Sequence, residues 1–349
     1  MLTGLSIQNM TVFQEADFAF SPGLNVVVGE NASGKTHFLK AGYCIAAALA
    51  AGGRQLSAEA PSKTYLQSAL AEKLVNVFRP ESLGRIVRRR QGRERCEMAA
   101  QFADIRLNTS FSFATQSKSE VSLEQVPGRW SDITPAYIPT REVLSLYPNF
   151  VSVYEKRYLE FEESYRDLCL LLGDPALRGP RENRIKELLK PLEEAMGGTI
   201  FLDKNGRFYL KISGQGNMEM PLVAEGIRKL AMMARLIMNG TLVDRGMLFW
   251  DEPDTSLNPK LITHVARFIM ALAQSGVQVL IASHSLFLLR ELEILRQSRD
   301  YRNTPARFFA LHPEEQGVSV QTGDALDDLD PIVSLDEELS QSDRYMEVQ

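Results

Sequence analysis

The chain has 349 residues, 44% of them hydrophobic and 24% charged, with a formal net charge of −5. This length and apolar content allow a large buried core, and no apolar run approaches the roughly 20 residues of a membrane span. The N-terminus lacks a basic and then apolar leader, and the three cysteines, Cys44, Cys96 and Cys169, have no zinc spacing, so we expect a cytoplasmic protein with free thiols and no membrane partner.

A phosphate-binding loop follows the first predicted buried strand. Residues 25–28, Asn-Val-Val-Val, run directly into the spacing G-x-x-x-x-G-K-T, which ends at Thr36, and a helix is expected to begin near Lys35. In such a loop, backbone N–H groups face one anion, the lysine charge reaches the β/γ-phosphates, and the threonine hydroxyl binds Mg²⁺. We therefore predict a nucleoside triphosphate site formed by Gly29, Asn31, Ala32, Ser33, Gly34, Lys35, Thr36 and His37.

Residues 85–95 form a run rich in arginine that contrasts with the acidic average of the chain. This run, which includes Arg88, Arg89 and Arg90, can contact the phosphates of nucleic acid. It can equally be a solvated strand edge or the seat of an acidic partner. Lysine and arginine elsewhere form no extended stripe, so nucleic-acid binding stays one of three alternatives.

The segment between this run and the second half of the chain changes its periodicity twice. Residues 96–130 alternate polar and apolar side chains, which predicts two or three antiparallel strands. Residues 151–196 have a helical period that glycine and proline interrupt. A hairpin is then expected over residues 200–210, with its turn at 204–207. The helical stretch is too short and too broken for a long coiled-coil arm.

Three predicted elements of the second half end in polar groups. An amphipathic helix runs to about Asn239, with Gly240 as its stop. The next strand ends in Asp251 and Glu252, and alternation sends these adjacent carboxylates in different directions. Asp251 is expected to hold Mg²⁺, and Glu252 to polarise the attacking water. The following strand ends at His284, at the edge where α/β sheets place their ligands, so His284 is a candidate sensor of the γ-phosphate.

Together these motifs resemble the ATP-binding-cassette (ABC) ATPase superfamily, in the soluble branch that includes RecF, the SMC-type proteins and the OLD-type AAA-family ATPases of prokaryotic defence systems. The resemblance rests on the segments GENASGKT, MLFWDEP, DTSLNP and IASHS, and residues 2–25 look like the N-terminal hairpin of that branch. It covers roughly residues 1–50 and 220–312. It implies a nucleotide-sandwich homodimer that binds ATP and Mg²⁺, with catalytic roles for Lys35, Glu252 and His284.

The dimer signature of the superfamily is where this sequence departs from the pattern. Residues 221–231 stand where L-S-G-G-Q is usual, and Ala224 replaces the serine. An ordinary core helix is the alternative to a signature here. The loss of one donor to a charged phosphate costs about 1.5–3 kcal/mol, so slow or partner-dependent hydrolysis is expected. Arg141 and Glu142 are the candidates to replace the usual coupling-loop glutamine. The implied contacts to the opposing nucleotide are Glu225, Gly226, Ser256 and Asn258.

Residues 324–349 are acidic, with a few apolar residues interleaved among the carboxylates, namely Leu329, Ile332, Val333 and Leu335. The motifs end by about His312, so this segment is not expected to build the ATP site. A disordered tail and a strip that docks onto another chain, or back onto the body, both fit this composition.

The sequence therefore predicts an α/β fold, a P-loop NTPase of the ABC-ATPase head type with an inserted β-strand and short helical subdomain. The expected parts are an N-lobe over 1–60, the insertion over 61–220, a C-lobe over 221–312 and an acidic tail over 313–349. We expect a Mg²⁺-dependent ATPase that acts as a homodimer or higher oligomer and controls a separate effector protein, as in phage defence. A RecF-like DNA-repair ATPase and an ATP-switched scaffold with little turnover are the alternatives.

Overall fold

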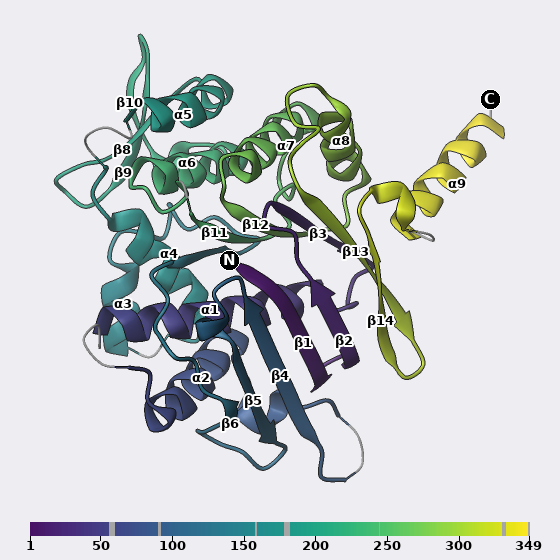
Figure 1. The fold of residues 1–349 in the computed structure, drawn as a ribbon. Coiled ribbons are helices and arrows are strands. Elements are labelled where there is room, and N and C mark those ends of the chain that lie inside the picture. The colour runs from purple at the N-terminus through teal and green to yellow at the C-terminus, as the bar shows by residue number, and fades with distance from the viewer. Residues whose placement is uncertain are drawn as a thin grey trace.

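The computed structural model describes residues 1–55, 60–89, 92–157, 159–177, 182–243, 245–329 and 333–347. Arg90 of the arginine-rich run and Ile332 of the acidic segment lie outside these residues. In the described part, one antiparallel sheet and one mostly parallel sheet share a layer of helices between them (Figure 1). The predicted α/β class is therefore confirmed.

The antiparallel sheet has five strands, which are neighbours in the order β2 (Phe13–Ala19), β1 (Leu2–Met10), β4 (Arg95–Phe102), β5 (Thr109–Ala114) and β6 (Ser122–Gln125). Buried and exposed side chains alternate along β2 and β4, so one face packs on helices and the other meets solvent. The pairing of β1 with β2 confirms the predicted N-terminal hairpin. The strands predicted over 96–130 are confirmed as β4, β5 and β6, and they extend that hairpin.

The second sheet has six strands, in the order β14 (Gly317–Gly323), β13 (Ala306–Glu314), β3 (Leu24–Gly29), β12 (Gln278–Ser283), β11 (Met247–Asp251) and β7 (Pro135–Ile138). Neighbouring strands pair in parallel except β14, which is antiparallel to β13. The carboxyl ends of β3, β11 and β12 therefore meet at one edge, which is where open α/β sheets bind ligands.

Helices cover both faces of the parallel sheet (Figure 1). On the face toward the antiparallel sheet lie α1 (Lys35–Gln55) and α2 (Lys63–Phe78), and on the other face lie α6 (Glu225–Met238), α7 (Pro259–Gln274) and α8 (Leu286–Gln297). Helix α6 ends at Met238 with Asn239 as its C-cap, and Gly240 follows with φ +84, close to the end that the sequence predicts. Short 3₁₀ turns lie at Leu83–Ile86, Ile105–Leu107, Met220–Leu222 and Leu326–Asp328.

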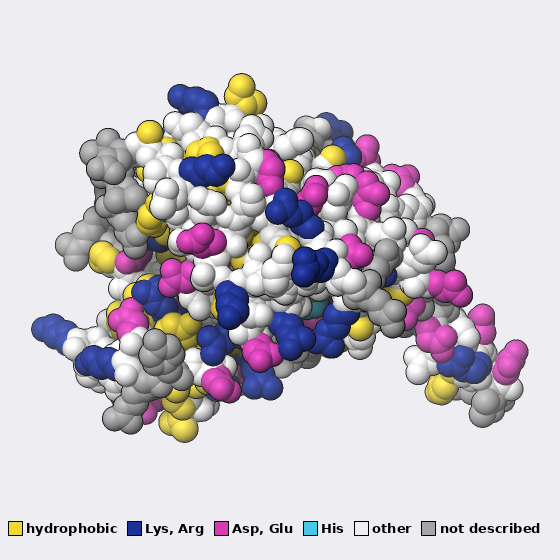
Figure 2. Space-filling view, turned by 90° about the horizontal axis from the view of Figure 1, so that it is seen from below, with side chains coloured by type: hydrophobic (Ala, Val, Ile, Leu, Met, Phe, Trp, Pro, Cys, Tyr) yellow, Lys and Arg dark blue, Asp and Glu magenta, His cyan; other side chains and the backbone are white. Residues whose placement is uncertain are grey.

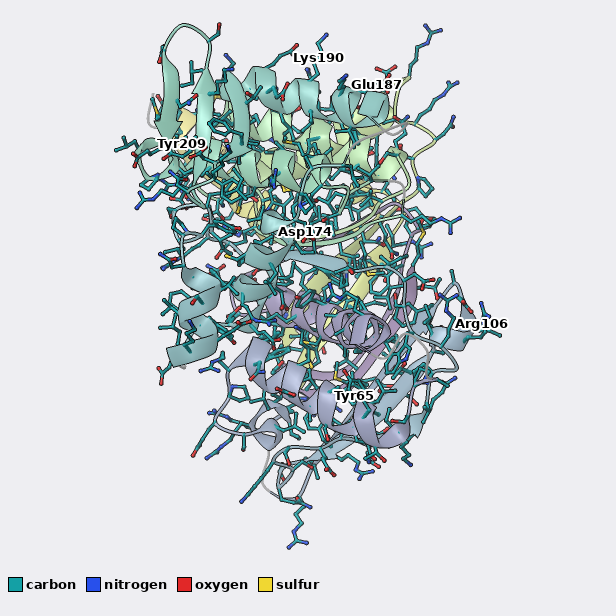
Figure 3. The ribbon with its side chains drawn as sticks, turned by 90° about the vertical axis from the view of Figure 1, so that its left-hand side faces the viewer. Tyr65, Arg106, Asp174, Glu187, Lys190 and Tyr209 are labelled. Atoms are coloured by element: carbon teal, nitrogen blue, oxygen red, sulfur yellow. The ribbon has the colours of Figure 1, made fainter. Side chains whose placement is uncertain are left out.

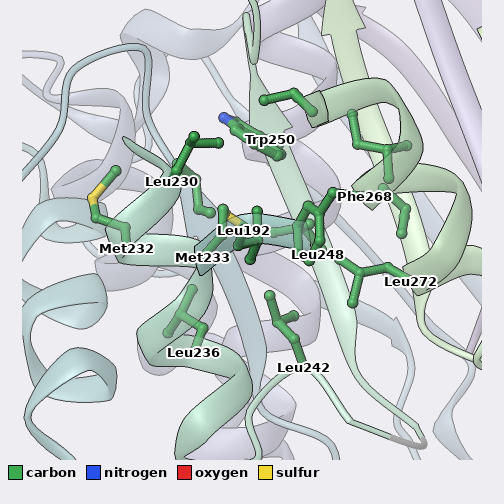
Figure 4. Close-up of a cluster of buried hydrophobic side chains, with 14 of the residues drawn as sticks. Leu192, Leu230, Met232, Met233, Leu236, Leu242, Leu248, Trp250, Phe268 and Leu272 are labelled. Atoms are coloured by element: carbon green, nitrogen blue, oxygen red, sulfur yellow. The ribbon is translucent and has the colours of Figure 1, made fainter. Parts of the chain in front are cut away.

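Alternate side chains of the central strands enter two separate cores. On β11, Met247 and Phe249 pack with α1 and the antiparallel sheet, whereas Leu248 and Trp250 pack on the opposite face. Figure 4 shows Leu248 and Trp250 near Met233 of α6 and other apolar side chains. A strand covered on both faces needs a continuous apolar run, which explains the sequence that leads to the two carboxylates.

A smaller part of the chain follows β7. It contains α3 (Phe150–Arg157), α4 (Glu163–Gly173), α5 (Glu182–Met196) and a three-stranded sheet of β8 (Gly198–Leu202), β9 (Phe208–Ile212) and β10 (Gly216–Glu219). The predicted hairpin over 200–210 is confirmed, with Gly206 at φ +74 in its turn. Figure 3 shows Lys190 of α5 and Tyr209 of β9 toward one end of the molecule, and Tyr65 of α2 toward the other. The helices here are short and separate, as predicted.

Residues 61–220, expected as one inserted subdomain, are divided among three parts of the fold. Strands β4 to β6 extend the N-terminal hairpin, and β7 is an edge strand of the parallel sheet. The elements from α3 to β10 belong to neither of these two sheets. Local periodicity does not reveal this division, because the partner of a strand is set by long-range pairing.

The C-terminal segment also differs from the expected division at residue 313. Strand β13 continues to Glu314, and β14 pairs with it as the edge of the parallel sheet. Leu326 and Leu329, which follow β14, are buried in the same core as Leu248 and Trp250. The acidic part therefore begins after Gly323, and α9 (Val333–Glu347) projects from the body (Figure 1).

The three cysteines are free, as predicted, and the structure shows that all three are buried. Within the described ranges, no helix is both long and apolar enough to cross a bilayer. The same residues contain no group of three or more His, Cys, Asp and Glu side chains arranged to hold a metal ion.

Candidate nucleotide-binding site

The loop between β3 and α1 has a backbone that requires glycine at two positions. Gly34 has φ +99, and a Cβ there would lie 2.6 Å from Val12 and 2.8 Å from Phe13. At Gly29 a Cβ would lie 2.6 Å from the Oγ of Ser33. The loop therefore wraps closely onto the N-terminus of α1, where free N–H groups and the helix dipole attract an anion.

Lys35 is the first residue of α1, and its side chain folds back over this loop. Its Nζ donates to the carbonyls of Gly29 and Glu30, at 2.8 Å each, and only 6% of the residue is exposed. Burial lowers the pKa of the amine, whereas the charges of Glu252 and Asp251 raise it. The loop thus holds a mostly buried cation, which a phosphate group would pair with strongly.

Thr36 and Asp251 meet at the carboxyl end of β11. The Thr36 hydroxyl donates to Oδ2 of Asp251 at 2.8 Å. Asp251 is 4% exposed, burial raises its pKa to about 6, and its Oδ1 has no hydrogen-bond partner among the described residues. An unpartnered buried oxygen is costly, and Mg²⁺ prefers hard oxygen ligands of this kind. These two residues therefore fit a bound Mg²⁺ ion.

Glu252 lies just beyond β11, in a turn where its φ is +47. Its N–H donates to the carbonyl of Ala282 at 2.9 Å, which fixes the turn to β12. One carboxylate oxygen lies 3.1 Å from Nδ1 of His284, and the other accepts from the Thr255 hydroxyl at 3.2 Å. The ends of β11 and β12 thus bring together the two side chains predicted for water activation and γ-phosphate sensing.

His37 is turned toward the N-terminal hairpin. Its Nδ1 lies 3.0 Å from the Thr11 hydroxyl, and its ring centroid is 5.7 Å from that of Phe78. Burial lowers the pKa of this imidazole. A contact between His37 and a nucleotide would therefore involve its backbone N–H rather than its ring.

A second group of predicted residues lies where α6 and α7 begin. Gly226 packs against the turn before α7, since a Cβ there would lie 2.8 Å from Leu257 and 3.2 Å from the Ser256 carbonyl. Ser256 has φ +65, and the Asn258 side chain caps α7. Glu225 is the first residue of α6. These residues form one region of the same chain, separate from the phosphate loop in sequence.

Two basic residues that the sequence analysis missed tie α6 to neighbouring loops. Lys229 is completely buried, and its Nζ donates to the Thr255 carbonyl at 2.6 Å. Arg228 pairs with Glu142 at 2.8 Å. Of the two coupling-loop candidates, Glu142 therefore faces α6, whereas Arg141 is exposed. In the sequence, the sign of a special role for Lys229 is its position among the apolar residues of an amphipathic helix.

A pocket of about 500 Å³ adjoins the phosphate loop at Ala32. The turn of the N-terminal hairpin, the β13–β14 turn and the arginine-rich run line this open pocket, and Arg85, Arg88 and Arg89 are among its lining residues. Figure 2 shows several Lys and Arg side chains gathered across the middle of the lower face, with Asp and Glu side chains between them. Part of the arginine-rich run therefore borders the candidate site.

Comparison with known proteins agrees with this geometry. The family described as "AAA domain, putative AbiEii toxin, Type IV TA system" matches residues 72–290. The chain belongs to this family. A second family, described as an AAA domain, matches residues 4–66, which hold the hairpin and the phosphate loop of this AAA-domain protein.

Curated relatives of the AAA-domain protein match over a short stretch. The DNA replication and repair protein RecF from Streptococcus equi subsp. zooepidemicus is 54% identical over 39 residues, which is 11% of this chain and 11% of RecF. RecF from Streptococcus equi subsp. equi matches to the same extent. The chain thus spans about a tenth of the length of these relatives.

The solved structures that share its fold include two of SMC heads. An SMC head bound to the C-winged helix domain of ScpA is 12% identical, with a TM-score of 0.55, over 93% of this chain and 98% of that one. An SMC head with an extended coiled coil, from Pyrococcus furiosus and bound to the C-terminal domain of ScpA, is 11% identical, with a TM-score of 0.51, over 98% and 99%. These matches confirm the predicted P-loop NTPase head fold, and the two family matches confirm the predicted AAA-family membership.

Proposed function

We propose that this AAA-domain protein is a cytoplasmic, Mg²⁺-dependent ATPase that works as a nucleotide-sandwich homodimer and controls a separate effector protein in phage defence. One observation carries the proposal. Asp251, Glu252 and His284 meet at the edge of the parallel sheet where strand β3 leads into the phosphate loop. Family membership and the shared fold with SMC heads support the ATPase part of the proposal.

The side chains divide the work of phosphoryl transfer. The loop N–H groups and Lys35 bind the β/γ-phosphates and neutralise their charge. Glu252 orients a water molecule and accepts its proton, and His284, 3.1 Å from that carboxylate, hydrogen-bonds the γ-phosphate. Mg²⁺, held by Thr36 and Asp251, would supply further neutralisation of the charge on the phosphates. Most of the catalysis is then positioning and electrostatic stabilisation.

We propose that the base and ribose of the nucleotide lie in the pocket beside Ala32. A nucleotide whose phosphates occupy the loop must extend away from it, and this pocket of about 500 Å³ borders the loop directly. Arg88 and Arg89 line it, and a guanidinium group can stack on an aromatic base. Under this proposal, part of the arginine-rich run contacts the nucleotide.

The dimer is supported by the region around Gly226 and Ser256. The N-cap of α6, Ala224, has no capping side chain, and the Ile227 N–H already donates to the Ala224 carbonyl, so the N–H groups of Glu225 and Gly226 are the ones left for an acceptor. A helix N-terminus attracts an anion such as the phosphate of a second chain. Each nucleotide would then lie between the phosphate loop of one chain and the Glu225, Gly226, Ser256 and Asn258 region of the other.

A separate effector is supported by two observations. The SMC heads with the same fold are bound to a domain of ScpA. In this chain, the acidic helix α9 projects from the body, and Figure 2 shows Asp and Glu side chains gathered on this segment at the right of the view. An effector with a basic groove would fit such a helix. Phage defence is the setting proposed from the resemblance to OLD-type ATPases.

Two other functions are each supported by separate observations. A RecF-like DNA-repair ATPase is supported by the 39-residue match to RecF and by the arginine-rich run. A scaffold that ATP switches with little turnover is supported by Ala224, which lacks the serine hydroxyl expected at the signature.

Measurement of ATP hydrolysis tests the proposed function. Wild-type protein should release phosphate only with Mg²⁺. Glu252→Gln should bind ATP with nearly unchanged affinity, lose turnover by about 100-fold or more and accumulate as an ATP-bound dimer, because the carboxylate acts on water. Lys35→Ala, the control, should lose ATP binding itself. Equal turnover by wild type and Glu252→Gln would contradict the role of Glu252, and an ATP-dependent dimer without turnover would favour the scaffold.

A further inference from the structure

Lys229 occupies an unusual position for a lysine. It lies on the second turn of α6 and is completely buried among residues that are otherwise mostly apolar. Burial lowers the pKa of its amine, while the charges of Glu225, Asp254 and Glu252 raise it. An apolar side chain would fill the same place on the helix without the cost of burying a charge. The position therefore points to a role beyond packing.

A chain of hydrogen bonds leads from Lys229 to the proposed catalytic carboxylate. The Lys229 Nζ donates to the Thr255 carbonyl at 2.6 Å, and the Thr255 hydroxyl donates to Oε2 of Glu252 at 3.2 Å. The other oxygen of Glu252 lies 3.1 Å from Nδ1 of His284. A single residue of the turn, Thr255, thus joins the ammonium group on α6 to the carboxylate at the end of β11.

The turn that receives this contact is strained at both ends. Glu252 has φ +47 and Ser256 has φ +65, a region that residues other than glycine seldom adopt. Such backbone persists only where the surroundings impose it. Within the turn, the Thr255 N–H donates to the Glu252 carbonyl at 3.2 Å, and the Lys229 contact adds a strong anchor from outside.

We propose that Lys229 is a positioning residue that holds the 252–256 turn, orients the carboxylate of Glu252 and presents Ser256 on the region around Gly226. The effect of Lys229 on the rate of ATP hydrolysis rests on the proposed ATPase function, whereas its effect on the conformation of the 252–256 turn does not. Because Lys229 lies on the same helix as Gly226, a displacement of α6 by an opposing nucleotide would reach Glu252 through Thr255.

Helix α6 offers a matched control for this proposal. Arg235 is also buried, and its guanidinium donates to the carbonyls of Leu172 and Asp174 at 2.9 and 2.6 Å. Arg235→Met therefore removes a buried cation from the same helix without touching the turn. Lys229→Met removes the ammonium group and keeps an unbranched apolar stem of similar length.

The experiment compares these variants in the nucleotide-free and turnover states. In Lys229→Met, the amides of the 252–258 turn should exchange hydrogen about tenfold faster or more, and kcat should fall by about 10- to 100-fold. The KM for ATP should stay within about threefold, since the phosphate loop is unchanged. Arg235→Met should leave the exchange of this turn unchanged. Thermal unfolding of each variant shows whether the fold is intact.

Thr255→Val provides a test that does not depend on the folding of the lysine variant. It keeps the carbonyl that Lys229 contacts and removes the hydroxyl that holds Glu252, so kcat should fall while the exchange of the turn stays near the wild-type rate. Wild-type exchange and wild-type kcat in Lys229→Met would overturn the proposal. If the wild-type protein shows no turnover, the ATPase function fails and the exchange of the turn alone decides the role of Lys229.

Discussion

At the scale of single residues, Asp251 joins the two halves of the candidate site. Its Oδ2 accepts from Thr36 of the phosphate-loop helix, and it precedes the carboxylate that is proposed to activate water. Its burial is possible because one oxygen is hydrogen-bonded, and the other is available to a cation. The protonation of the Asp251 carboxylate should therefore affect both the stability of the protein and its affinity for Mg²⁺.

Asp251 makes the stability of the metal-free protein depend on pH. Its pKa rises from 3.8 to about 6 on folding, so the folded state binds this proton more tightly than the unfolded state. The stabilising contribution is then present below about pH 4 and is lost as the pH rises to about 6, by about 3 kcal/mol in all. Asp251→Asn should remove this difference between pH 4 and pH 7 in urea unfolding without Mg²⁺.

Wild-type protein is the reference in that measurement, because all other titratable groups contribute equally to the pH dependence of the wild type and of Asp251→Asn. An identical pH dependence in the two proteins would contradict the raised pKa. Mg²⁺ requires the ionised carboxylate, so the affinity of wild-type protein for Mg²⁺-ATP should fall as the pH drops below about 6.

At the scale of elements, the arginine-rich run lies between a strand edge and a pocket. Val87 forms an isolated bridge with Met10 of β1, which brings Arg88 and Arg89 beside the hairpin turn and the phosphate loop. Farther along, Arg93 and Arg95 are exposed. The same run therefore supplies two pairs of arginines with equal charge and different surroundings.

These two pairs distinguish nucleotide binding from DNA binding. Arg88→Ala with Arg89→Ala should raise the KM for ATP by about tenfold, because each guanidinium contact with the base is typically worth about 0.5–1 kcal/mol at an exposed site. Arg93→Ala with Arg95→Ala should leave it unchanged. If the run instead contacts duplex phosphates, both double variants should flatten the salt dependence of DNA binding, with a slope smaller by about 2. Unchanged KM in the first variant would contradict the pocket assignment.

At the scale of the whole molecule, α9 is the element least integrated into the fold. It projects from the body, and Tyr345 and Met346 near its end are 68% and 76% exposed. Leu326 and Leu329 before it are buried, and Asp324 pairs with Arg307 at 2.9 Å. The boundary between body and projecting segment therefore lies after Leu329 rather than at Gly323.

Truncation after Leu329 should leave ATP binding nearly unchanged and weaken a higher assembly or an effector complex. The reason is that α9 contributes no residue to the candidate site, while its exposed apolar and acidic groups suit a partner. Light scattering of full-length and truncated protein with ATP, with and without the co-purifying partner, measures this. Tyr345→Ser with Met346→Ser in the full chain isolates the apolar contribution. An identical assembly state and identical partner retention would show that α9 does not dock.

Local sequence determined the core of the candidate site. Gly29, Gly34 and Lys35 act within one loop, where the positive φ of Gly34 and the contacts of Lys35 with the Gly29 and Glu30 carbonyls arise within a few residues. Asp251, Glu252 and His284 each follow an apolar run that reads as a buried strand, and parallel strands end at a common edge. For these reasons the phosphate loop, the two carboxylates and the histidine were predictable from spacing and alternation.

Tertiary structure alone decided which distant groups meet. Thr36 and Asp251 are 215 residues apart, and Lys229 reaches a carbonyl 26 residues away across a loop. Strands β4 to β6 joined the N-terminal hairpin, and β14 joined the parallel sheet, although nothing in their own sequences specifies these partners. The physical reason is that strand register and side-chain contact depend on how whole layers pack, whereas periodicity records only which face of each element is buried.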